Sequence, residues 1–366
     1  MRSTIRIAVL CAALAAVVVG SVVLSRRHGE GAGGASGPSG ADAAAVALDP
    51  LDAIPDGALL VATVDVRALR RTAIGERFLG KGRTIPGLGA VTEVCSADPM
   101  DGVIRLAVAV PAQGGEADFG VFVTGRLDAD ALLDCAKTVV ERRGGRPIVS
   151  PAGRFRVLRD LSAADAGAEL AVAPGGPVLL GQGAYLRSSI DAVEGRLPSI
   201  RGNAEHARLR ALVPDGAVVA TVVLTPSLRQ TLAQELAAQG TPESPFLAVV
   251  GAAASLELAA ELRFELALQC DRPGTCAEAA AILERTSRAR GQALGDRAPE
   301  LSALLGELAY RVEANALHVS LSVSTRRALG VLDEVLAASP PPAASASPSA
   351  APSAARPAPA ATAAPH

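Results

Sequence analysis

Two stretches in the C-terminal half of the chain alternate between apolar and other side chains. Every second position is leucine or phenylalanine in residues 262–269, and leucine or valine in residues 317–323. A period of two places successive side chains on opposite faces of a strand. Both stretches therefore predict strands with one buried face and one wet face.

The predicted elements come in the same order in two segments, residues 45–199 and 200–338. Each segment opens on Pro-Asp-Gly-Ala, at Pro55 and at Pro214, which we interpret as a type I turn with Pro second and Gly last. From Pro55 to Thr72, 8 of 18 positions are identical to the position 159 residues later. A repeat of this length indicates a duplicated domain.

Each segment is predicted to contain a strand, a helix, two strands, a helix, a hairpin and a last helix. In the first segment these are residues 58–66, 67–79, 103–110, 119–125, 128–143, 168–173 with 178–181, and 184–194. In the second they are residues 217–225, 227–238, two strands within 255–270, 276–290, 308–312 with 317–323, and 325–337. We therefore expect an α+β fold of two tandem duplicated domains, each a mainly antiparallel sheet with helices on one face.

The N-terminus carries a localisation signal. Ile7–Ser25 is an uncharged run of 19 residues, which as a helix is about 28 Å long and close to the thickness of a bilayer core. We expect residues 1–27 to form an uncleaved signal-anchor helix in the inner membrane, with the folded part in the periplasm. Positive charges on the two sides of this run nearly balance, so the predicted orientation in the membrane rests on a slight excess of positive charge on the N-terminal side. Cleavage after Ser25, which gives a secreted protein, is the alternative.

Composition separates two further segments from the folded part. Residues 28–44 are rich in Gly, Ser and Ala and are predicted to be a flexible tether. Residues 339–366 are almost wholly Pro, Ala and Ser and are predicted to be a disordered tail with polyproline-II character. Aromatic residues make up 2% of the chain, so the core must consist of aliphatic side chains. The net charge of −2 gives no indication of nucleic-acid binding.

Four cysteines follow the N-terminal segment, two in each repeat. An even number in an exported domain is typical of disulfides, and we pair Cys95 with Cys135 and Cys270 with Cys276. A zinc site is the less favoured alternative, because neither half has a C-x2-C motif or a nearby histidine.

The chain offers few groups that carry chemistry. His206 and His318 are interpreted as surface histidines, since neither has other metal ligands at suitable spacing. Asp128 with Asp130 could form an acidic metal-binding pair, but an N-terminal helix cap is the favoured interpretation. Residues 80–84 lack the spacing of a phosphate-binding loop. The sequence thus predicts no catalytic residue, no metal ligand and no cofactor.

Several segments resemble a family of uncharacterised bacterial membrane-anchored proteins with tandem α+β halves. The resemblance rests on Ile54–Arg70, on Cys95-x-x-Asp98-Pro99 leading into Leu106–Pro111, and on the helix bearing Cys135. It extends over most of residues 50–338 and implies an N-terminal membrane helix, a tether and paired domains. It implies no activity.

The leading hypothesis is a membrane-anchored envelope protein without catalytic activity, whose paired domains have a binding or structural role. Its partners would be the membrane, through one helix, and an unidentified envelope component. The alternative is an envelope hydrolase with its active site between the two repeats. A deep pocket there with a strongly shifted carboxylate or histidine would favour the enzyme.

Overall fold

The computed structural model describes residues 49–79, 94–95, 100, 102–112, 118–162, 167–238 and 245–338. The predicted signal-anchor helix, the tether and the Pro-rich tail lie outside these residues. Of the helices that the structure describes, none is both long enough and apolar enough to cross a bilayer.

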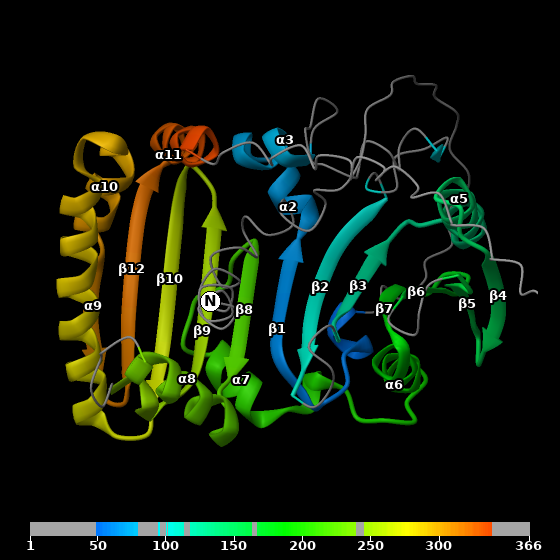
Figure 1. Ribbon diagram of the computed structural model, residues 1–366, viewed down its shortest axis with the longest axis horizontal. Coiled ribbons are helices and arrows are strands. Elements are labelled where there is room, and N and C mark those ends of the chain that lie inside the picture. Colours follow the sequence, from blue (N-terminus) through cyan, green and yellow to red (C-terminus); the bar gives the residue numbers. More distant parts are fainter. Residues whose placement is uncertain are drawn as a thin grey trace, which may run out of the picture.

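The described chain forms one 12-stranded antiparallel sheet (Figure 1). Its strand order is β11-β12-β10-β9-β8-β1-β2-β3-β7-β6-β5-β4. The strands are β1 (Ala58–Asp65), β2 (Val103–Pro111), β3 (Gly120–Gly125), β4 (Pro147–Ala152), β5 (Phe155–Asp160), β6 (Ala168–Val172), β7 (Val178–Gln182), β8 (Val218–Val223), β9 (Val249–Leu258), β10 (Glu261–Cys270), β11 (Ala309–Glu313) and β12 (Ala316–Ser324).

Helices connect the strands and pack on the sheet. The α-helices are α2 (Val66–Arg70), α3 (Ala73–Leu79), α5 (Ala129–Arg142), α6 (Gly183–Val193), α7 (Ala204–Arg210), α8 (Pro226–Ala238), α9 (Pro273–Leu294), α10 (Pro299–Gly306) and α11 (Thr325–Ala338). Short 3-10 helices are η1 (Pro50–Ala53), η2 (Ile200–Gly202), η3 (Pro245–Ala248) and η4 (Gly295–Arg297). The α+β class and the antiparallel sheet are as the sequence predicts.

The strand order is the same on both sides of the central pair, β1 and β8. The first segment runs β1-β2-β3-β7-β6 outward from the centre, and the second runs β8-β9-β10-β12-β11. The first segment continues with the β5-β4 hairpin. At the centre Ala62 pairs with Ala220, between the pairs Leu60–Val222 and Val64–Val218. The two segments therefore share one continuous sheet.

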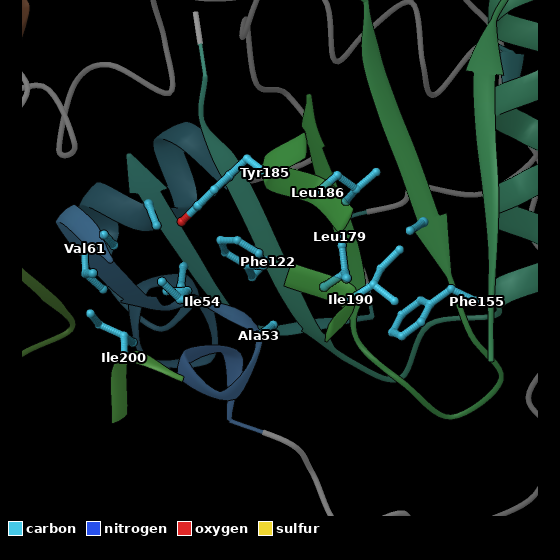
Figure 2. Close-up of a cluster of buried hydrophobic side chains, with 14 of the residues drawn as sticks. Ala53, Ile54, Val61, Phe122, Phe155, Leu179, Tyr185, Leu186, Ile190 and Ile200 are labelled. Carbon is cyan, nitrogen blue, oxygen red and sulfur yellow. The ribbon is translucent and has the colours of Figure 1, made fainter. Parts of the chain in front are cut away.

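Helices lie on both faces of this sheet, where one face was expected. We call one the α6 face: Figure 2 shows Phe122 of β3 and Phe155 of β5 packed there with Leu186 and Ile190 of α6. The helix α7 packs on the same face through Leu209. We call the opposite side the α9 face, where α9 and α5 pack at opposite ends (Figure 1).

Two local predictions were wrong. The expected helix over residues 67–79 is two helices, because the Thr72 hydroxyl donates to Leu69 O (2.8 Å) and accepts from Gly75 N–H (2.9 Å), which ends α2 and caps α3. In the first Pro-Asp-Gly turn, Ala58 N–H donates to Pro55 O at 3.3 Å. Pro55 is therefore the first residue of that turn rather than the second.

Both predicted cysteine pairs are confirmed. The Cα atoms are 5.0 Å apart for Cys95–Cys135 and 5.8 Å apart for Cys270–Cys276. The second disulfide closes a short loop between β10 and α9, since its cysteines are 6 positions apart.

Replacing both Cys270 and Cys276 by serine is expected to lower the free energy of unfolding by about 2 kcal/mol, because the open loop gains entropy in the unfolded chain. Urea unfolding of the oxidised proteins measures the difference. An unchanged unfolding midpoint and slope would contradict the prediction.

Candidate functional site

An apolar cavity that opens to the surface lies between α5 and the sheet. This cavity has a volume of about 260 Å³, slightly below the roughly 300–1,000 Å³ usual for small-molecule sites. Its walls are mainly aliphatic: Leu132, Ala136, Val139 and Val140 of α5, with Leu158, Leu170 and Leu180 of β5, β6 and β7. Cys135, Ala168, Arg159 and Asp160 complete the lining. A cavity of this kind suits a short apolar group.

Polar contacts at the first turn hold α5 above the cavity. The carboxylate of Asp128 accepts from the N–H groups of Asp130 (2.9 Å) and Ala131 (3.1 Å), so the predicted helix cap is confirmed. Asp130 pairs instead with Arg156 of β5, at 2.6 Å. These two carboxylates therefore position the helix.

The rim of the cavity at the other end of α5 is built around Asp160. Its Oδ1 accepts from the Ser162 hydroxyl (2.6 Å), Ser162 N–H (2.9 Å) and Arg146 N–H (2.8 Å). These hydrogen bonds, that of the Ser162 hydroxyl above all, lower the pKa of the Asp160 carboxyl. A Cβ at Gly145 would come within 2.4 Å of the other oxygen of Asp160. The carboxylate is thus ionised and fixes the turn that follows α5.

The α9 face extends from the cavity toward the centre of the sheet. Leu180, in its wall, pairs with Val121 of β3, and Val121 is half-buried on the same face. Further along lies a cluster of apolar residues, which we call the strand cluster: Leu60, Ala62, Ala220 and Val222, with Val110 and Leu224 beside them. The cavity and the buried strand cluster thus lie on the same face of the sheet, between α5 and α9.

His206 lies at the junction of the two segments and is buried, with 6% of its surface exposed. The prediction of a surface histidine was therefore wrong. Its Nε2 is 3.0 Å from Ala58 O and its Nδ1 is 2.7 Å from the Thr221 hydroxyl. A carbonyl only accepts, so Nε2 carries the hydrogen and Nδ1 accepts from Thr221. Pro111, which pairs with Ala58, has no N–H to offer that carbonyl.

At this junction, His206 and Thr221 are the two side chains that most resemble a catalytic base and its nucleophile. Burial lowers the pKa of His206 and keeps the imidazole neutral. Thr221 is only 5% exposed, so a substrate has no path to its hydroxyl. Next to it, the side-chain N–H of Asn203 donates to Asp56 Oδ1 at 2.8 Å. The contacts identify α7 as a structural link between the two segments.

The other groups that the sequence singled out do not converge on a site. His318 was also expected at the surface, but its side chain is 12% exposed and its Nδ1 lies 3.1 Å from Glu265 Oε1. Residues 80–84 are outside the described chain. Among the residues that the structure places, no three His, Cys, Asp or Glu side chains are grouped to hold a metal ion.

The sequence did not predict the cavity. The strands at residues 168–173 and 178–181 were predicted, and so was the helix at 128–143, but their mutual packing depends on long-range pairing that periodicity does not reveal. His206 was missed for a related reason, because its partners Ala58 and Thr221 are 148 and 15 positions away.

No protein-family model matches the chain, and no curated protein matches it. One solved structure similar to it is that of TP0453 in crystal form I, at 12% sequence identity. The match covers 79% of this chain and 98% of that chain, with a TM-score of 0.45. A likeness this weak carries no argument about function.

Proposed function

We propose that the chain is a membrane-anchored protein of the cell envelope that binds an apolar ligand, without catalysis, in the cavity under α5. The class of ligand that fits is a short acyl chain or a similar aliphatic group. Export is supported by the uncharged segment Ile7–Ser25 and by two disulfides, which persist in oxidising compartments. The equal strand order on both sides of β1 and β8 supports an origin by duplication.

The observation that carries the binding role is the aliphatic lining of the cavity. Side chains from α5 and from three strands face a space of about 260 Å³ that opens to the surface, so their apolar atoms meet water when the space holds no ligand. Filling such a space with an apolar group recovers the missing contacts and removes apolar surface from water.

Replacing Ala136 by phenylalanine is expected to weaken the binding of decanoate at least 10-fold, because the ring occupies the cavity. Ala136 lines this space from the inner side of α5. Isothermal titration calorimetry on the full-length protein in detergent-free buffer measures the change.

The matched control is Ala131→Phe, the same substitution at an exposed position of the same helix. Its affinity for decanoate is expected to equal that of the unaltered protein. Equal binding by all three proteins, or the absence of binding by any, would overturn the proposed site.

A further inference from the structure

The strand cluster on the α9 face consists of strand residues and the adjoining Leu224, with no helix residue of the described chain among them. Even so, Ala62 and Val222 have exposed fractions of 0% and 1%. Side chains on a single uncovered sheet layer keep contact with water, and a sheet buries its apolar face by packing against a second layer. The strand cluster therefore requires a covering element.

The shape of the strand cluster suits one helix laid along the strands. Ala62 and Ala220 face each other across β1 and β8, and larger residues flank them as the pairs Leu60–Val222 and Val64–Val218. Two opposed alanines form a dip into which a helix can approach closely. The 8 residues of β1 extend about 27 Å, and a helix about 10 Å wide covers two strand spacings.

One segment of the same chain matches this space in length and chemistry. Ile7–Ser25 has 19 residues without a charge and is about 28 Å long as a helix. Small residues make up much of it, including a run of alanines and valines and Gly20. An uncharged helix places no unpaired charge against the apolar strands, so its packing there carries no cost of charge burial.

The connection is long enough. Residues 26–48 join the segment to Asp49, where the described chain begins. As a flexible Gly-rich chain these residues have an end-to-end distance of about 26 Å and a much longer extended reach. Attachment at this distance gives the segment an effective concentration on the order of millimolar near the sheet, far above that of any second molecule in dilute solution.

We propose that Ile7–Ser25, in protein that is outside a bilayer, packs as a helix on the strand cluster between α9 and α5. The same apolar segment then has two alternative environments, the bilayer and the protein's own sheet. The proposal rests on the uncleaved segment of the proposed function, but not on ligand binding in the cavity.

The native cysteine content provides a direct test. Cys11 lies in the segment, and the other four cysteines are held in disulfides. Val108 of β2 pairs with Ala62 of the strand cluster, so the single substitution Val108→Cys adds a second thiol on the α9 face. The matched control, Ser320→Cys, adds one at an exposed position of the opposite face, on β12. A short bis-maleimide alkylates one thiol with each of its rings and so links two nearby cysteines.

The full-length V108C protein in detergent-free buffer is expected to give at least 10-fold more internal cross-link to Cys11 than the S320C protein. Peptide mapping by mass spectrometry identifies the linked pair. Phospholipid vesicles are expected to reduce the V108C cross-link at least 10-fold, because one helix cannot occupy both environments.

Three results would overturn the proposal. Equal cross-linking of V108C and S320C means that the segment has no preferred site. Cross-links between two molecules, in place of cross-links within one, would mean that the segment of a second copy packs on the strand cluster. If phospholipid vesicles leave the V108C cross-link unchanged, the segment does not exchange between the strand cluster and the bilayer. Adding Ala136→Phe to V108C separates the two proposals, since it blocks the cavity and is expected to leave the cross-link unchanged.

Discussion

Replacement of Phe122 by alanine is expected to lower the free energy of unfolding by about 3–5 kcal/mol. The ring is completely buried on the α6 face and meets Tyr185 edge-to-face, with centroids 6.4 Å apart (Figure 2). Its surroundings fit closely: a Cβ added at Gly120 would lie 2.4 Å from the Phe122 ring. Removing the ring therefore leaves a cavity that neighbouring strands cannot fill.

Urea unfolding measures the loss, and Phe264→Ala is the matched control. Phe264 is also a strand phenylalanine, but it is half-buried on β10, so its removal is expected to cost less than half as much. If the two substitutions cost the same, the α6 face would not be the tightly packed side of the sheet.

The sequence predicted those strands that have one buried face and one face in contact with water. Residues 262–269 and 317–323 alternate in sequence and form β10 and β12 as expected. The start of β9 was missed, because its residues 251–256 are buried on both faces and show no alternation. Periodicity records a difference between two faces, and a strand covered on both sides has none.

The β4–β5 hairpin was missed for a different reason. Pro147 and Pro151 lie within β4, and prolines argue against a strand unless it is at an edge. β4 is the last strand of the sheet, which is where proline is tolerated. Only the complete strand order reveals that position.

The candidate site was predictable only in its local parts. The cap at Asp128 and both disulfides follow from residue type and spacing. The cavity under α5 requires the pairing of β5, β6 and β7, and β5 belongs to the hairpin that the sequence did not reveal. The burial of His206 likewise depends on the pairing of β1 with β8, which no pattern within either strand specifies.

Replacement of His206 by leucine is expected to lower the free energy of unfolding by about 2–4 kcal/mol at pH 7.5, since it leaves two buried groups unpaired at about 1–3 kcal/mol each. These groups are the Thr221 hydroxyl and the carbonyl of Ala58, both of which bond to the imidazole. Urea unfolding of the two proteins gives the difference.

A double-mutant cycle with Thr221→Val tests whether the lost bond is the cause. Valine replaces the hydroxyl by a methyl group of similar size, so in the H206L background no unpaired hydroxyl remains. Thr221→Val is therefore expected to cost about 1 kcal/mol less in that background than in the unaltered protein. Strict additivity would mean that the side chains are not coupled.

The pH dependence of the free energy of unfolding gives an independent test of the neutral His206. Burial lowers the pKa of His206 below its usual 6.5, outweighing the hydrogen bond to Ala58 and the nearby charges of Glu205 and Asp56. As pH falls through 6.5, the unfolded chain takes up a proton on this histidine before the folded chain does, so the free energy of unfolding decreases. The H206L protein lacks this loss. The difference in free energy of unfolding between the two proteins is therefore expected to become smaller from pH 7.5 to pH 5. A difference that becomes larger would require a protonated His206 in the folded protein.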